Sequence, residues 1–465
     1  MINYFNFKEY DDCYLITNEL GLSCFLTKSD FNLLVDDKLT DKNPKYQELY
    51  EKFFVYHERK EVFIDRIHEH LRCSKNYLFS ATSLFIFVVT NLCNADCIYC
   101  QAQDSSSICR GKMDLETARK SVEIAMTSPN RYLSFEFQGG EPLLNFEIIK
   151  FIVEYSNELK LQFDKIIEYS VVSNLTLLTD EMIDFFSKNN VSVSTSLDGN
   201  EEMHNLNRPL KSGAKPFYDV VKGYYKLKER DIVVGAIETT TKNTLNKYKE
   251  LIDTYVDLGL ESVFIRPLTP LGIAKENWER IGYSAEDFID FYKKSIEYLI
   301  ELNEKGIFIR EGHANIFLQK IINGESINYM ELRSPCGASI GQMAFYYDGK
   351  IFTCDEGRML SEMGNNAFQL GDVNNTFEEL INNPVCKSAC ASSILEAIPD
   401  CCDCVYSPFC GTCPVINLAL DGDIFPNQAK NYRCKIYSGM LDTLFDYFKN
   451  NNEKAISVLK SWVDN

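Results

Sequence analysis

The sequence lacks the features that would direct the protein to a membrane, a secretory pathway or nucleic acid. No apolar run reaches the roughly 20 residues that a membrane-spanning helix needs. The N-terminus, Met1-Ile-Asn-Tyr-Phe-Asn, has neither the basic stretch nor the cleavage site of a secretory signal. Basic residues are also scarce: 48 Lys and Arg stand against 67 Asp and Glu, and the net charge of −19 disfavours contact with phosphates. We therefore expect a cytoplasmic protein with no membrane or nucleic-acid partner.

Cysteine, by contrast, is abundant. The chain has 17 cysteines in 465 residues, and ten of them lie from Cys336 to Cys434 at spacings typical of metal ligands. In a chain without an export signal, such cysteines are more often metal ligands than disulfides. The length predicts two or three domains. The isolated cysteines, which we expect to be ordinary core or surface residues, are Cys13, Cys24, Cys73 and Cys109.

The most informative stretch joins a predicted strand to three closely spaced cysteines. Residues 84–90 are apolar, β-branched or aromatic, which predicts a buried strand. Cys93, Cys97 and Cys100 follow, with three residues in the first gap and two in the second. Three thiolates can hold three irons of a 4Fe-4S cluster and leave the fourth iron without a protein ligand. Zinc prefers four ligands, usually from paired Cys-x-x-Cys units, so a zinc site is the weaker interpretation.

This spacing resembles the signature of the radical S-adenosylmethionine (SAM) enzymes. The resemblance implies that Cys93, Cys97 and Cys100 hold a 4Fe-4S cluster whose open iron binds the amino and carboxylate groups of SAM. It also implies that an electron from an external low-potential donor passes through the cluster and cleaves SAM to a 5′-deoxyadenosyl radical.

Residues 79–310 alternate between predicted strands and predicted helices. The strands are expected at 84–90, 132–138, 166–173, 191–197, 232–239 and 262–267, and the helices at 115–126, 146–159, 180–188, 218–228, 245–255 and 285–302. Six such repeats predict an α/β fold, a parallel sheet curved as a partial (β/α)6 barrel. Barrel enzymes carry their chemistry at the C-terminal ends of the strands, which is where the cysteine loop falls.

Glycines and polar residues follow the other predicted strands and resemble the SAM contacts of the same family. After the second strand comes Gly139-Gly140-Glu141-Pro142, where the glycines let the backbone approach a ligand closely. In the family this motif binds the SAM amino group, and later residues bind the ribose and the carboxylate. Each polar residue among them has an equal interpretation as a cap or turn residue. The SAM-binding residues that the resemblance implies are Tyr99, Gly139, Gly140, Glu141, Pro142, Ser173, Asn174, Ser196 and Arg208.

Residues 311–440 lose this periodicity and become rich in cysteine. A Gly-x4-Cys segment ends at Cys354, and a Cys-x2-Cys-x5-Cys segment begins at Cys401. Both resemble the SPASM extension of radical SAM enzymes, which carries auxiliary 4Fe-4S clusters; a zinc ribbon is the alternative interpretation. The resemblance implies two auxiliary clusters. Its ligand sets are Cys336, Cys354 and Cys413 for the first cluster, and Cys401, Cys404, Cys410 and Cys434 for the second.

The chain departs from the SPASM pattern at the first auxiliary cluster. The family has a further cysteine where this chain has Gly341-Gln-Met, and three residues rather than two between the cysteines that match Cys410 and Cys413. The first auxiliary cluster therefore either keeps an open iron, which could hold a substrate thiolate, or takes a fourth ligand. The cysteines available for that role are Cys386, Cys390 and Cys402.

The two ends of the chain are predicted to be separate units. Residues 1–78 contain two short predicted strands and three predicted helices, which resemble the winged-helix recognition element fused to many peptide-modifying enzymes. That element binds a leader peptide by adding it to a sheet as a further strand. A structural cap or a dimerisation module is the alternative. Residues 441–465 are predicted to form a C-terminal helix.

Longer stretches resemble the maturases of His-Xaa-Ser peptide systems, among them Ile265-Arg-Pro-Leu-Thr-Pro and Asp355-Glu-Gly-Arg-Met-Leu. We therefore predict a radical SAM oxidoreductase that modifies a precursor peptide bearing a leader sequence. It would abstract hydrogen from the peptide and close a thioether, ether or carbon–carbon crosslink.

Two alternatives to a crosslinking enzyme follow from the same residues. The first is a sulfatase-type maturase that forms formylglycine. In those enzymes an Asp directly after a SPASM cysteine is the proposed base, and Asp355 matches it, although Asp355 could equally deprotonate a crosslinking substrate or be a turn residue. The second alternative is a non-catalytic iron–sulfur electron carrier, which would not need the Gly-Gly-Glu-Pro motif.

Overall fold

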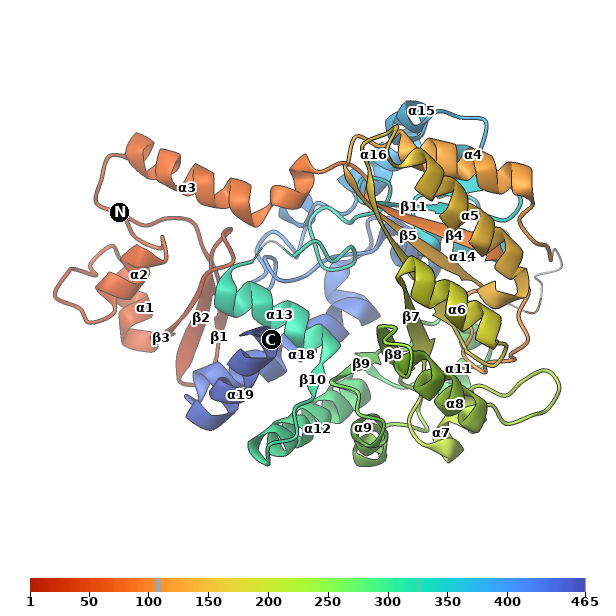
Figure 1. The fold of residues 1–465 in the computed structure, drawn as a ribbon. Helices are drawn as coiled ribbons and strands as arrows, with labels where there is room; N and C mark the ends of the chain where they lie inside the picture. The colour runs from red at the N-terminus through yellow and green to blue at the C-terminus, as the bar shows by residue number, and fades with distance from the viewer. Residues whose placement is uncertain (104, 106–109, 326, 465) are drawn as a thin grey trace.

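A single curved sheet runs through the middle of the protein (Figure 1). The computed structural model describes residues 1–465 except 104, 106–109, 326 and 465, so Cys109 lies outside the described residues. The sheet has ten strands in the order β10-β9-β8-β7-β6-β5-β4-β11-β12-β13. Across the described ranges, no helix combines the length and apolar character needed to cross a bilayer.

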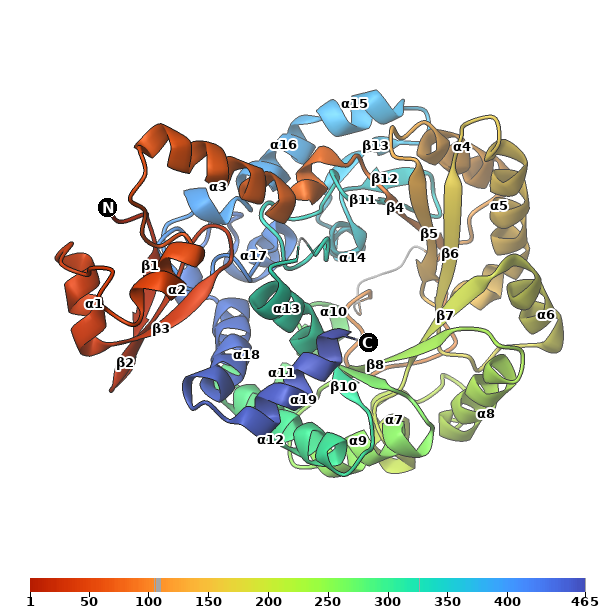
Figure 2. The ribbon, with the colours of Figure 1, turned by 60° about the vertical axis from the view of Figure 1, so that its left-hand side comes forward.

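Six parallel strands form the partial barrel, and all six predicted strands are present with ends within two residues of those predicted. Helices cover the outer face of the arc (Figure 2). The barrel stays open, because β10 and β13 end the sheet instead of pairing. The strands are β4 (Leu84–Thr90), β5 (Tyr132–Gly139), β6 (Ile166–Ser173), β7 (Val191–Ser196), β8 (Val234–Thr239) and β9 (Ser262–Arg266).

Each barrel strand places alternate residues on opposite faces, because side chains along a strand alternate in direction. Phe85, Phe87 and Phe135 face outward into the core under the helices, while Ile86 and Val88 face the interior of the barrel. The covering helices are α4 (Leu115–Met126), α5 (Phe146–Leu159), α6 (Asp180–Asn189), α7 (Glu201–Asn207), α8 (Phe217–Lys228), α9 (Tyr248–Asp257) and α12 (Ala285–Glu304), and η2 (Pro142–Asn145) precedes α5. The short helices α10 (Gly272–Glu276) and α11 (Trp278–Ile281) follow β9, and Ile273 N of α10 donates to Cys100 O of the cysteine loop at 2.9 Å.

The cysteine-rich region continues the barrel sheet. The hairpin of β11 (Gln342–Phe345) and β12 (Lys350–Phe352) turns at Gly349, which has a positive φ of 90°. Strand β11 pairs in parallel with β4, and β13 (Gln369–Asp372) pairs with β12. This places the region directly beside the strand that leads into the cysteine loop. Its other elements are β10 (Arg310–Glu311), α13 (Gly312–Asn323), α14 (Asp355–Glu362), α15 (Phe377–Asn382), α16 (Pro384–Ala391), η3 (Leu395–Ala397), α17 (Pro414–Asp421), η4 (Gln428–Lys430), α18 (Tyr432–Lys449) and α19 (Glu453–Asp464).

The N-terminal unit is a three-stranded antiparallel sheet with helices on one face, and its first strand was not predicted. Ile16 and Leu26 face a small core with α1, whereas Leu15 belongs to the large core of the barrel and C-terminal helices. In both ribbon views the sheet lies beside α18 (Figures 1 and 2). The elements are β1 (Asn6–Glu9), β2 (Cys13–Thr17), β3 (Ser23–Thr27), α1 (Lys28–Val35), α2 (Tyr46–Glu51), α3 (Lys60–Ser74) and η1 (Asn76–Phe79).

Candidate active site

The loop after β4 gathers the three predicted cluster cysteines and is fixed by backbone hydrogen bonds to a second loop. Asp96 N donates to Pro209 O at 2.7 Å, and Ile98 N donates to Asn207 O at 3.0 Å. Burial raises the pKa of the Cys93 thiol to about 11 and that of the Cys97 thiol to about 12. A metal ligand must be a thiolate, so a positively charged partner is needed to ionise these thiols near neutral pH.

The Gly-Gly-Glu-Pro motif lies against this loop. A Cβ added to Gly140 would stand 2.2 Å from the Leu92 carbonyl oxygen, and Glu141 N donates to that same oxygen at 2.8 Å. Glu141 is buried, and its carboxylate accepts from Ser173 Oγ and Asn174 N, both at 2.8 Å. Burial nevertheless raises the pKa of Glu141 to about 7. The motif therefore ties the end of β5 to the end of β6 and keeps the backbone of both close to Cys93.

Arg208 stands over the Tyr99 ring, 5.0 Å from its centroid, and both residues bind one carboxylate. Arg208 Nε donates to Asp198 Oδ2 at 3.0 Å, and the Tyr99 hydroxyl donates to the same oxygen at 2.5 Å. Asp198 was not among the predicted site residues. The signal that could have found it is its place two residues after the end of β7, in the segment Ser196-Leu-Asp-Gly.

Most of the predicted SAM contacts meet at one cavity of about 110 Å³. Tyr99 and Pro142 are not among the described residues that line it; Tyr99 lies behind Arg208, and Pro142 begins η2. His204 also lines the cavity and was missed; burial lowers its pKa to about 4, so it is a neutral group there. The predicted residues on the cavity wall are Cys93, Cys97, Gly139, Gly140, Glu141, Ser173, Asn174, Ser196 and Arg208; missed ones include Gln138, Thr176 and His204.

These residues fit a 4Fe-4S cluster and SAM. The thiols of the cysteine loop supply ligands, Gly139 and Gly140 leave no room for side chains between motif and loop, and Arg208 supplies a cation for a carboxylate. The sixteen described cysteines are all free thiols. Among the described residues, no three His, Cys, Asp or Glu side chains meet closely enough to hold one single metal ion.

The four cysteines predicted for the second auxiliary cluster line one cavity of about 390 Å³. Burial, and after it the neighbouring Cys434 and Cys404 thiols, raise the pKa of the Cys410 thiol to about 12. Burial and the neighbouring cysteine thiols also raise the pKa of the Cys401 thiol. A cavity walled by Cys401, Cys404, Cys410 and Cys434 fits a cluster with four protein ligands.

The three cysteines predicted for the first auxiliary cluster also lie together, in a small buried core. Burial is the main cause that raises the pKa of the Cys354 thiol well above its usual value. The nearby Glu356, Cys413 and Cys336 act in the same direction. Cys390, on α16, is close enough to Cys336 for their charges to interact. Cys402 instead lines a different cavity. Of the possible fourth ligands, Cys390 is thus better placed than Cys402.

Asp355, the predicted base, is the first residue of α14 and is buried. Arg358, one turn later, donates from Nε to Asp355 Oδ1 at 3.0 Å and makes a second hydrogen bond from Nη2 to the same oxygen. Both hydrogen bonds end on Oδ1. The carboxylate is therefore held in one orientation by an adjacent cation.

Comparison with known proteins also points to radical SAM chemistry. Residues 87–242 match the sequence profile of the Radical SAM superfamily. An uncharacterised protein of Methanocaldococcus jannaschii is 32% identical over 185 residues, which are 40% of this chain but only 62% of that relative, less than two thirds of its length. The radical SAM cyclopropyl synthase TigE of Paramaledivibacter caminithermalis is 25% identical over 364 residues, covering 74% of this chain and 72% of TigE. A cysteine-type anaerobic sulfatase-maturating enzyme of Clostridium perfringens is 27% identical over 284 residues, covering 59% of this chain and 74% of the relative.

Two solved structures share the fold. Native anSMEcpe with bound AdoMet superposes with a TM-score of 0.69 at 22% identity, over 82% of this chain and 99% of that one. Streptococcus suis SuiB bound to precursor peptide SuiA superposes with a TM-score of 0.56 at 15% identity, over 91% of this chain and 98% of SuiB. The partial barrel, its cysteine loop and the profile match over residues 87–242 show an enzyme with the radical SAM fold, whose cofactors are SAM and 4Fe-4S iron–sulfur clusters.

Proposed function

We propose that the protein is a maturase that binds the leader of a ribosomally made precursor peptide and crosslinks its core. One comparison supports a peptide substrate, because SuiB is described with a bound precursor peptide. TigE, named as a radical SAM cyclopropyl synthase, supports radical chemistry that forms new bonds. This proposal includes three finer assignments: membership of the His-Xaa-Ser maturases, two auxiliary clusters with the ligand sets given above, and an external low-potential electron donor.

The observation that carries the peptide proposal is the three-stranded N-terminal sheet. Helix α1 covers one face, and the other face packs toward the C-terminal helices through Leu15 and Phe25. Within the described residues β1 and β3 each have a single strand neighbour, β2. With both faces covered, an open edge is the remaining place for an extended peptide, which would add as a strand and gain main-chain hydrogen bonds.

The residues of the barrel would position the reacting groups. Arg208 is held by Asp198 with its guanidinium at the cavity wall, where it would bind the carboxylate of SAM. The backbone of Gly139 and Gly140 would receive the amino group, and the buried Glu141 fixes that backbone against the cysteine loop. When bound, the cofactors supply the hydrogen-abstracting radical and the acceptor for the electron that crosslinking releases.

Asp355 is the proposed acceptor for the proton that leaves the substrate as the crosslink closes. Among the described residues Arg358 is the donor to its side chain, and both hydrogen bonds end on Oδ1. The second carboxylate oxygen is thus the one proposed to take the proton. Asp355→Asn should slow crosslinking more than SAM cleavage.

The test is turnover of the reconstituted full-length enzyme with SAM, dithionite and the short peptide encoded nearest its gene. We expect 5′-deoxyadenosine to form in step with a peptide that has lost the mass of two hydrogens. A sulfatase-derived cysteine peptide is offered to the enzyme in parallel as a control. Deoxyadenosine formed without any change in the mass of the encoded peptide would contradict the proposal.

A formylglycine-forming sulfatase maturase is a second candidate, and the comparisons support it as well. The Clostridium perfringens relative is named as a cysteine-type anaerobic sulfatase-maturating enzyme, and anSMEcpe shares the fold. The two products differ in mass, because formylglycine formation removes the sulfur of the substrate cysteine whereas a thioether retains it. Conversion of the sulfatase-derived peptide, with the encoded peptide unchanged, would favour this candidate.

A further inference from the structure

The cavity of the second group of cysteines is closed on one side by the N-terminal sheet. Phe7 and Lys8 of β1 line it together with the four thiols. These two residues are nearly 400 positions away from the cysteines in sequence, and they belong to the unit proposed to bind the peptide. The wall of the cavity is therefore shared between two units of the chain.

Asn6, next to these residues, holds the loop between two of the cysteines. Its Nδ2 donates to Cys402 O at 3.1 Å and to Cys404 O at 3.0 Å. An amide nitrogen has two hydrogens, so both can be used on these two carbonyls. Cys401 and Cys404, the proposed ligands, bracket this short turn. The Tyr4 hydroxyl also donates to Cys402 O, at 3.2 Å, but Asn6 is the side chain that bonds both carbonyls of this turn.

Neighbouring residues of the same sheet face reinforce this contact. The β1–β2 register pairs Asn6 with Thr17 and Lys8 with Leu15, which puts all four on one face. Thr17 Oγ1 donates to Val405 O at 2.7 Å. Lys8 forms an ion pair with Asp442 of α18, the helix that also carries Cys434. The sheet therefore contacts both segments that supply thiols to the cavity, the 401–410 loop and helix α18.

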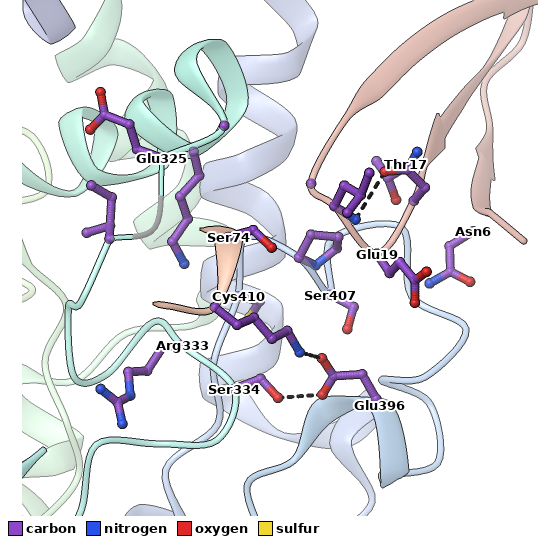
Figure 3. Close-up of a pocket in the computed structure, with 18 of the residues that line it drawn as sticks. Asn6, Thr17, Glu19, Ser74, Glu325, Arg333, Ser334, Glu396, Ser407 and Cys410 are labelled. Carbon is purple, nitrogen blue, oxygen red and sulfur yellow. Dashed lines mark hydrogen bonds and ion pairs between the residues drawn. The ribbon is translucent and has the colours of Figure 1, made fainter. Parts of the chain in front are cut away.

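Apolar packing through Leu15 covers only part of the contact between the two units, and the part beside these hydrogen bonds is hollow. A cavity of about 280 Å³ lies there (Figure 3). Asn6, Thr17 and Glu19 approach it from the N-terminal sheet, and Ser407 and Cys410 from the cysteine-rich region. Where apolar packing is interrupted, individual hydrogen bonds have more influence on the position of the loop.

We propose that the N-terminal sheet is a structural part of the second auxiliary iron–sulfur site, with Asn6 as the positioning residue for the loop that bears Cys401 and Cys404. This rests on the proposed assignment of an auxiliary cluster to these cysteines, and goes beyond it by giving the peptide-binding unit a second role. Removal of residues 1–78 would also expose the core around Leu15, so point variants are the appropriate test.

The experiment compares Asn6→Ala with Asn3→Ala in the full-length, reconstituted holoenzyme. Asn3 is a matched control, because its Nδ2 also donates to a backbone carbonyl, Phe53 O at 3.0 Å, but within the N-terminal unit. Iron release to a chelator is followed by absorbance. Loss of two hydrogen bonds should make release about tenfold faster in Asn6→Ala, for about four irons per chain, with Asn3→Ala near the wild type.

A spectroscopic measurement separates positioning from general destabilisation. In a background with Cys93, Cys97 and Cys100 replaced by Ala, Asn6→Ala should alter the electron paramagnetic resonance spectrum of the reduced auxiliary clusters, and Asn3→Ala should not. Thr17→Val, which keeps the side-chain shape, should give a smaller change of the same kind and serves if Asn6→Ala fails to fold. Wild-type spectra and release rates in both variants, or equal effects of Asn6→Ala and Asn3→Ala, would overturn the proposal.

The outcome is independent of the peptide chemistry. If the wild-type enzyme leaves every peptide unchanged while Asn6→Ala still loses iron faster, the proposed function fails and the positioning role stands. If peptide crosslinking is observed and iron retention is indifferent to Asn6, the positioning role fails and the proposed function stands.

Discussion

The glycine at position 140 offers a stringent test of the site, because the clash from a single added methyl group can be read from the structure. Alanine at this position would place its Cβ 2.2 Å from the Leu92 carbonyl oxygen and 2.9 Å from that of Asn91. Ordinary contacts of a Cβ begin near 3.4 Å, so the loop must retreat by about 1.2 Å. Both neighbours are backbone atoms directly before Cys93, which would have to move with them.

A displacement of this size matters more for catalysis than for folding. Misplacement by about 1 Å can reduce a rate about 100-fold, whereas an overpacked methyl group typically destabilises a protein by about 1–3 kcal/mol. We therefore expect Gly140→Ala to remain folded and to form 5′-deoxyadenosine at least about 30-fold more slowly than the wild type.

The matched control is Gly235→Ala, because a Cβ at Gly235 in β8 meets no atom within 4 Å. The assay is single-turnover SAM cleavage by the reconstituted enzyme, followed by chromatography of 5′-deoxyadenosine, with circular dichroism to verify folding. Gly235→Ala should cleave SAM at the wild-type rate. A folded Gly140→Ala enzyme with a rate within about threefold of the wild type would refute the placement of the motif against the cysteine loop.

Three further predictions concern the cluster, the SAM carboxylate and stability. Replacing Cys93, Cys97 and Cys100 by Ala should abolish 5′-deoxyadenosine formation and lower the iron content from about twelve to about eight per chain; surviving SAM cleavage would contradict the cluster assignment. Arg208→Lys keeps the charge but loses the stacked, forked guanidinium, so SAM binding measured by equilibrium dialysis should weaken about tenfold; an unchanged Kd would remove Arg208 from the site. Burial raises the pKa of Glu311 to about 7, so its contribution to stability is complete below about pH 4.3 and is lost as the pH rises through about 7. Glu311→Gln should therefore flatten the change in urea midpoint between about pH 5 and pH 8, and an equally steep change in this variant would show that other groups cause it.

Several features of the site depended on residues that are close in sequence, and these could be predicted. The three-residue and two-residue gaps of the cysteine loop follow a strand whose apolar run is unbroken. The two glycines and Glu141 come directly after a strand of alternating pattern, and β5 begins where it was expected. These signals are local because the period of a strand and the ligand spacing of a loop are properties of consecutive residues.

Other features involve partners that no local pattern specifies. The part of Asp198 in holding both Tyr99 and Arg208 was not predicted, and neither was the place of His204 on the cavity wall. Both follow from the way β7 and the loop after α7 meet at the cysteine loop. The missed strand β1 is short, four residues, with alternate positions exposed, and such strands give a weak sequence signal.

The sequence by itself determined the class of fold, the six barrel strands and the three-cysteine loop, because each is encoded in periodicity or spacing over a few residues. The two auxiliary groups of cysteines were implied by the resemblance to the SPASM extension. Only the tertiary structure decided that β11 pairs with β4, that Cys390 rather than Cys402 lies near Cys336, and that Asn6 holds the backbone of Cys402 and Cys404. These contacts join residues about 50 to 400 positions apart. Their formation depends on which buried surfaces fit together once the whole chain is packed, and that complementarity is a property of the assembled core.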